Sequence, residues 1–120
     1  MARNKRISSL ENLELVDKVE IDKTWMGATA IFFWDKRVLH VQLEIWHYSN
    51  RIILENEYTT ISKFRQFLDS VHLGNFLESA LGFDPRDKHL RRLILDMDLA
   101  IENSDKLTRF NRENGAIGPE

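Results

Sequence analysis

Four histidines are the residues of this sequence best suited to metal or acid–base chemistry, and their spacing argues against a shared site. His40 and His47 lie an odd number of residues apart in a segment that alternates apolar and polar residues. Successive side chains of a β-strand point to opposite faces, so these two imidazoles would face opposite ways. His72 and His89 belong to separate predicted helices, and no His-x-x-x-His spacing is present. The sequence therefore predicts no metal site and no cofactor.

The acidic residues near the end of the last predicted helix resemble a carboxylate cluster. Positions i and i+2 of a helix point about 200° apart, so Asp96 and Asp98 diverge and only Asp98 and Glu102 are neighbours. This pattern indicates a solvated helix face. The sequence also has no glycine-rich phosphate loop, no Gly-x-Ser-x-Gly and no cysteine nucleophile. We therefore predict that the protein is not an enzyme, with an unrecognised site near His40 and Glu44 as the weaker alternative.

Length and composition predict a soluble single domain. A chain of 120 residues fits one domain, and 17 basic against 19 acidic residues exclude the strongly basic balance of a typical nucleic-acid binder. The absence of cysteine fits a reducing compartment, and the charged first six residues have no apolar run behind them as a signal peptide would. No stretch approaches the roughly 18 apolar residues of a membrane span. These features predict a cytoplasmic protein.

The first half of the chain has the period-two and β-rich pattern of strands. Alternating apolar residues, together with β-branched and aromatic runs bounded by turn residues, predict a four-stranded antiparallel meander joined by two-residue turns. The predicted strands are Leu13–Ile21, Trp25–Trp34, Val38–Ile45 and Arg51–Tyr58, and the predicted turns are Asp22-Lys23, Asp35-Lys36 and Ser49-Asn50.

These turns define a register that places one apolar face across all four strands. It pairs Phe32 with Leu39, and it leaves Ala28 and Ala30 at the centre, where their small side chains let a helix lie close. A slip of one residue would destroy the apolar face, which favours this register. Asp17 is the one residue that does not fit. The other predicted core pairs are Val19–Met26, Leu15–Ala30, Leu13–Phe32, Ala30–Val41, Ala28–Leu43, Met26–Ile45 and Ile45–Leu54.

The second half has the apolar spacing and capping residues of helices. Thr60 can cap a first helix that stops at Gly74, a short continuation ends at Gly82, and Asp84 followed by Pro85 can begin a last helix. The predicted fold class is therefore α+β, a four-stranded antiparallel meander followed by two or three helices packed on one face. The predicted organisation is a polar tail over 1–12, one domain over 13–104 (sheet 13–58, helices 60–104) and a polar tail over 105–120.

The second face of the predicted sheet is the candidate functional surface, because it is more apolar than a face that only meets water. The same register places Trp25 opposite Trp46, Ile31 opposite His40, Phe33 opposite Val38 and Glu44 opposite Glu55. The candidate partner-binding residues are Trp25, Ile31, Phe33, His40, Glu44, Trp46, Ile53 and Glu55, with Glu57 nearby.

Large aromatic patches on a surface usually mark interfaces. We therefore predict a protein–protein interaction module, such as a small regulator, inhibitor or assembly factor, that forms a homodimer or binds another protein with basic residues. The main structural alternative is that the chain itself covers this face, for instance through Leu107 or Phe110. The alternative function is binding of single-stranded nucleic acid on the same face, assisted by the basic residues Arg3, Lys5 and Arg6.

Overall fold

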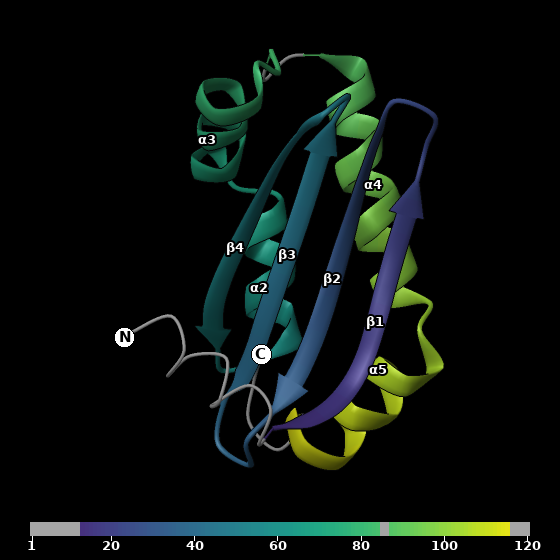
Figure 1. Cartoon of the computed structure of the whole chain (residues 1–120). Coiled ribbons are helices and arrows are strands. Elements are labelled where there is room, and N and C mark those ends of the chain that lie inside the picture. Colours follow the sequence, from purple (N-terminus) through teal and green to yellow (C-terminus); the bar gives the residue numbers. More distant parts are fainter. Residues whose placement is uncertain (1–12, 85–86, 116–120) are drawn as a thin grey trace.

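The structure, a computed structural model, describes residues 13–84 and 87–115, and it contains one open antiparallel sheet with helices on one side (Figure 1). The strands follow one another in the order β1-β2-β3-β4, as the meander prediction requires. The predicted α+β class is therefore confirmed. The strands are β1 (Glu14–Asp22), β2 (Met26–Trp34), β3 (Leu39–His47) and β4 (Asn50–Tyr58), followed by α2 (Ile61–Leu68), α3 (Val71–Leu81), α4 (Lys88–Glu102), α5 (Asp105–Phe110) and a π-helical turn η1 (Asn111–Gly115).

The apolar face of the sheet is the predicted one, but the residues that pair across it are different. Phe32 lies opposite Val41 instead of Leu39, a shift of two positions. The pairing of β3 with β4, and that of β1 with β2 from Asp17 onward, is also displaced by an even number of residues. Because side chains alternate with period two, an even displacement keeps each residue on its face. The observed core pairs are Val19–Ala30, Ala28–Ile45, Ala30–Leu43, Phe32–Val41, Leu43–Leu54 and Ile45–Ile52.

The turns explain the displacement. The β2–β3 loop has four residues, 35–38, because the Asp35 carboxylate accepts hydrogen bonds from the backbone N–H of Arg37 and of Val38, both at 2.8 Å. The last hairpin keeps a two-residue loop, but the loop is Tyr48-Ser49, one position earlier than predicted. Side-chain bonding of this kind sets turn geometry locally and leaves little trace in apolar periodicity.

A β-bulge between Leu15 and Asp17 changes the face of the first residues of β1. Leu15 lies opposite Phe33 on the second face, so its predicted place in the core was wrong. Asp17, the residue that did not fit, lies at the sheet edge and accepts a hydrogen bond from the Ser104 hydroxyl at 2.6 Å. The bulge thus lets the carboxylate meet the start of α5 instead of entering the core.

The helices bury the first face of the sheet, which we call the helix face. Ala28 and Ala30 are almost fully buried, consistent with helices lying close over the middle of β2. Phe64 of α2 contacts Phe32 edge-on, with ring centroids 5.4 Å apart. The stripe of α4 that enters this core consists of Leu90, Leu93, Met97 and Ile101.

The helix boundaries confirm the predicted positions of Thr60 and Gly82 and correct that of Gly74. The Thr60 cap is confirmed, since its hydroxyl accepts the Lys63 N–H at 3.2 Å. Gly74 does not stop the helix, because α2 already ends at Leu68 and a new helix, α3, begins after the Ser70 cap and runs through Gly74. Gly82 does end α3, with a left-handed φ of 73° that favours glycine.

The cap of α4 is Asp87 and not Asp84, because the Asp87 carboxylate accepts the His89 N–H at 2.7 Å. Pro85, which the predicted helix start included, lies outside the described residues. We expect Asp87→Ala to lower the free energy of unfolding by about 1 kcal/mol, because a helix donor loses its acceptor. Chemical denaturation measures this loss. A denaturation midpoint equal to that of wild type would contradict the assignment of the cap.

The folded region extends beyond residue 104, which corrects the predicted C-terminal tail. In α5, Leu107 and Phe110 are buried, and Phe110 packs edge-on against Trp34 with centroids 5.0 Å apart. Both residues lie with the helix-face core, so neither covers the second face. Residues 1–12 and 116–120 of the predicted tails lie outside the described residues. Within the described ranges, no helix combines the length and apolar character needed to cross a membrane.

Candidate functional site: the open sheet face

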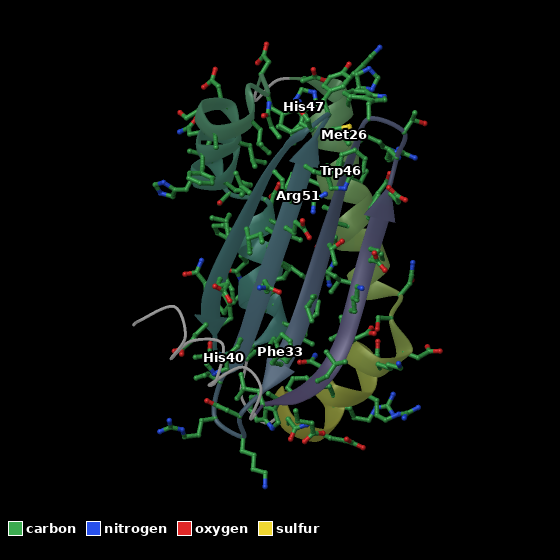
Figure 2. All side chains as sticks on the ribbon, in the orientation of Figure 1. Met26, Phe33, His40, Trp46, His47 and Arg51 are labelled. Atoms are coloured by element: carbon green, nitrogen blue, oxygen red, sulfur yellow. The ribbon has the colours of Figure 1, made fainter. Side chains whose placement is uncertain are left out.

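The sheet face that points away from the helices, which we call the open face, carries four cross-strand rows of side chains. Figure 2 shows Trp46 and Arg51 at one end of this face, and Phe33 and His40 at the other. The rows are Asp22–Gly27–Trp46–Arg51, Glu20–Thr29–Glu44–Ile53, Lys18–Ile31–Gln42–Glu55 and Leu15–Phe33–His40–Glu57.

Trp46 lies against the backbone of Gly27. A Cβ atom at Gly27 would come within 2.5 Å of the Trp46 Nε1 atom and 2.7 Å of the Ile21 carbonyl oxygen, so only glycine leaves room for the indole. An isolated glycine inside a strand often marks such a close approach, and this signal could have identified Gly27 from the sequence. The contact fixes the position of Trp46 while leaving it partly exposed.

Trp25 does not belong to the open face, so its predicted pairing with Trp46 was wrong. It lies in the β1–β2 loop and contacts Tyr48 of the last hairpin and His89 of α4, with ring centroids 5.8 Å and 5.1 Å apart. It also contacts His47, which faces the helix side and donates a hydrogen bond from its Nδ1–H to the Leu81 carbonyl oxygen at 3.1 Å. The structure thus places the two tryptophans in different environments.

His40 lies between two carboxylates at the far end of the open face. Its Nε2 atom is 3.0 Å from Asp35 Oδ2, and its Nδ1 atom is 3.5 Å from Glu57 Oε2. Glu44, which the sequence placed in the same hypothetical active site, lies two rows away and pairs with Arg51 at 3.0 Å. Among the described residues, no group of three or more histidines and carboxylates is placed to hold a metal ion.

The hydrogen bond from His40, followed by those from the Val38 and Arg37 N–H groups, holds the pKa of Asp35 well below its ordinary value. A carboxylate whose pKa is lower in the folded than in the unfolded state stabilises the fold at pH values above its unfolded pKa of about 4. This stabilisation is lost as the pH falls toward the folded pKa. We therefore expect Asp35→Asn to lower the denaturation midpoint at pH 7 and to have a smaller effect at pH 2.5. A difference from wild type that stayed constant over this range would contradict the assignment.

The charges of the open face are mainly negative. Five carboxylates face two cations, Lys18 and Arg51, and the predicted neighbours Glu44 and Glu55 are separated because Glu44 lies opposite Ile53. Glu55 instead accepts a hydrogen bond from the Gln42 amide at 3.4 Å. The face therefore has an excess of carboxylates that would repel a phosphate backbone. The five carboxylates belong to Glu20, Asp22, Glu44, Glu55 and Glu57.

Apolar side chains occupy two parts of the open face. Leu15, 58% exposed, lies opposite Phe33 at one end, and Ile31 is next to Phe33 along the same face. Ile53, 54% exposed, lies in the row next to that of Trp46. The predicted pairs Ile31–His40 and Phe33–Val38 are not formed, since His40 lies opposite Phe33. The apolar surface is thus divided by the polar residues of the central rows.

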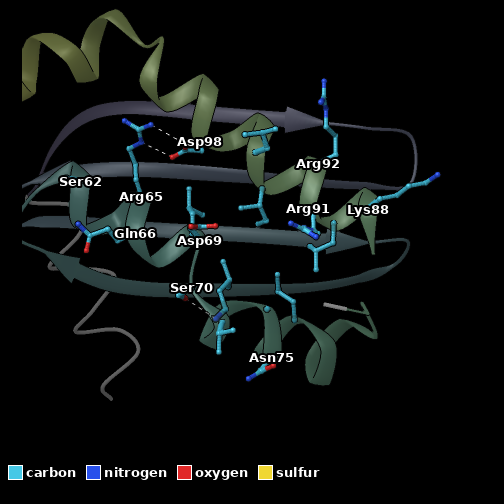
Figure 3. A pocket seen from close by; sticks show the side chains of 18 residues that line it. Ser62, Arg65, Gln66, Asp69, Ser70, Asn75, Lys88, Arg91, Arg92 and Asp98 are labelled. Carbon is cyan, nitrogen blue, oxygen red and sulfur yellow. Dashed lines mark hydrogen bonds and ion pairs between the residues drawn. The ribbon is translucent and has the colours of Figure 1, made fainter. Parts of the chain in front are cut away.

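A groove on the other side of the molecule is the second candidate site. It has a volume of about 1080 Å3 and lies between α2, α3 and α4 (Figure 3). Arg65 of α2 closes one side by donating hydrogen bonds to both carboxylate oxygens of Asp98, at 2.7 and 3.1 Å. Ligand sites usually combine an apolar cavity with a few convergent polar groups. Here the polar side chains are distributed over three helices, so the groove defines no particular ligand.

The chain matches no protein-family model, no curated protein and no solved structure.

Proposed function

We propose that this protein is a binding module whose open face docks a partner protein rich in basic residues. One observation carries the proposal: the helices lie on one side of the sheet, while the other side presents exposed apolar residues among an excess of carboxylates. A sheet face that only meets water has no need of apolar side chains, whereas this face carries five among its polar residues, namely Leu15, Ile31, Phe33, Trp46 and Ile53. Apolar contacts supply affinity for such a partner, and the carboxylates select one that offers lysine or arginine.

The charge of the open face separates this partner from two alternatives. Two copies that met face to face would bring carboxylates against carboxylates, so self-association through this face is disfavoured. A single-stranded nucleic acid would meet the same repulsion, and binding by base stacking requires aromatic platforms beside a positively charged groove. Trp46 has no second tryptophan beside it on this face, since Trp25 lies in the β1–β2 loop.

Site-specific photo-crosslinking tests the proposal. A benzophenone amino acid replaces Phe33 on the open face or, as the matched control, Phe76 on α3, which is 43% exposed. In cells of the protein's own source, we expect a crosslinked protein from position 33 and not from position 76. Mass spectrometry should locate the crosslink in a basic segment of that protein.

Charge reversal on the open face provides a second test of the proposed function. Glu20→Lys together with Glu44→Lys should remove the crosslink at position 33 while the circular dichroism spectrum stays unchanged. The purified partner should bind less tightly as salt concentration rises, because exposed charges are screened. A crosslink that survives charge reversal, or that forms equally from position 76, would overturn the proposal. A labelled single-stranded oligonucleotide should not bind, and salt-sensitive binding of it would favour the nucleic-acid function instead.

A further inference from the structure

The edge of the sheet at β4 is a second surface with a defined chemistry. In the described part of the chain, β4 pairs only with β3, and no strand pairs with its outer side. An edge strand of this length offers a row of backbone N–H and C=O groups to another strand. Arg51, Ile53 and Glu57 are all exposed along it.

The hairpin determines which backbone groups of β4 point outward. His47 and Asn50 close the two-residue loop and form a hydrogen-bonded pair, and such pairs alternate along an antiparallel ladder. The even-numbered residues of β4 therefore direct their N–H and C=O groups to β3. The odd-numbered residues Arg51, Ile53, Glu55 and Glu57 direct theirs outward. These four residues also carry the open-face side chains of β4.

We propose that two copies of this chain pair through β4, antiparallel, about a two-fold axis at Leu54. Leu54 is the middle residue of Asn50–Tyr58, so this register pairs the whole strand with its copy. It places Arg51 of one copy opposite Glu57 of the other, twice, and Ile53 opposite Glu55. Every outward N–H and C=O group of the odd-numbered residues then has a partner, because these residues form the hydrogen-bonded pairs of the new ladder.

Charge complementarity and pairing over the whole strand together favour this register. An axis at Ile53 would also pair Arg51 with a glutamate, Glu55, but it would leave one end of Asn50–Tyr58 unpaired. The side chains of Arg51 and Glu57 are each 64% exposed, so both can reach across the edge. A two-fold axis at Glu55 instead of Leu54 would place Glu55 opposite Glu55 of the other copy. Like charges directly opposite each other destabilise a strand pair. The interface is isologous, as a two-fold dimer requires. The resulting eight-stranded sheet joins the two open faces side by side, and this inference does not depend on what the open face binds.

Cysteine scanning tests the axis directly, because the chain has no cysteine of its own. In the full-length protein, Leu54→Cys should form a disulfide-linked dimer under mild oxidation. Residues at the axis face their own copies in a non-hydrogen-bonded pair, whose Cα separation of about 4.5 Å lies within disulfide range. Ile53→Cys is the matched control, since it would face Glu55 and should not crosslink although Ile53 is 54% exposed. Crosslinking of the Ile53 variant equal to that of the Leu54 variant would indicate random collision and overturn the proposal.

Charge exchange tests the register by an independent measurement. By analytical ultracentrifugation, wild type should be a dimer, and Arg51→Glu should raise the dimer Kd about tenfold by replacing two attractive pairs with repulsive ones. Arg51→Glu combined with Glu57→Arg should restore the wild-type Kd. Arg51→Glu with Glu55→Arg should not restore it, because that pair belongs to the register centred on Ile53. A monomeric wild type, or rescue only by the Glu55 variant, would overturn the proposed axis.

Discussion

Phe64→Ala is expected to lower the free energy of unfolding by about 3–5 kcal/mol, the largest loss among the substitutions considered for this fold. Phe64 is 1% exposed and joins α2 to two strands. Its ring meets Phe32 of β2 and Tyr58 of β4 edge-on, with centroids 5.4 and 5.3 Å apart. Alanine would remove both aromatic contacts and leave a cavity between α2 and the sheet.

Denaturant unfolding followed by circular dichroism measures the loss. The free energy of unfolding of an ordinary domain is about 5–15 kcal/mol, so the variant would retain only a part of it. Its unfolding midpoint should therefore shift to a much lower denaturant concentration. Phe76→Ala on α3 is the matched control, because the same side chain is removed from a position that is 43% exposed. Its effect should be below about 1 kcal/mol. Similar losses in both variants would mean that α2 does not dock through Phe64.

Ala30→Leu is expected to destabilise the protein by about 1–3 kcal/mol, because added methylene groups overpack a filled core. Ala30 is 0% exposed and lies between Val19 and Leu43 on the helix face. The neighbouring substitution Thr29→Val adds no length and falls on the open face, between Glu20 and Glu44, so it should change stability by less than about 0.5 kcal/mol.

The two variants test the assignment of the sheet faces. Thermal denaturation of both under the same conditions gives the comparison. If Thr29→Val were the more damaging change, the faces of β2 would be reversed. The test does not depend on the strand pairing, since any even displacement leaves Ala30 under the helices.

Sheet faces could be predicted from the sequence because they depend only on period-two alternation. Strand pairing could not, because it depends on loop length, and the β2–β3 loop is set by hydrogen bonds from the backbone to the Asp35 side chain. The dependence on loop length also explains why the position of Trp25 was predicted wrongly. A two-residue turn would have placed it on the open face, whereas the longer loop moves it to the end of the sheet beside His89.

Two further differences arise from capping and packing. Ser70 begins α3 three residues before Leu73, whose N–H it accepts, and this local cap outweighs the helix-stopping tendency of Gly74. Helix α5 could have been recognised from the capping residue Ser104 and from the apolar residues Leu107 and Phe110 at helical spacing. For the candidate site, Ile31, Phe33, His40, Glu44, Trp46, Ile53 and Glu55 were placed on the correct face, while Leu15, Gly27 and Arg51 were missed.

The order in which the strands follow one another has a consequence for how the chain folds. Each strand pairs with the next along the sequence, so the sheet can form through successive hairpins with short loop closures. The contacts that join α4 and α5 to the first hairpin involve residues much further apart in the sequence. Lys23 and Asp96 are 73 residues apart, and Asp17 and Ser104 are 87 residues apart. Formation of these contacts carries the larger loop-closure entropy. We therefore expect the docking of α4 and α5 onto β1 to come late in folding, and the hairpins to gain protection from hydrogen exchange first.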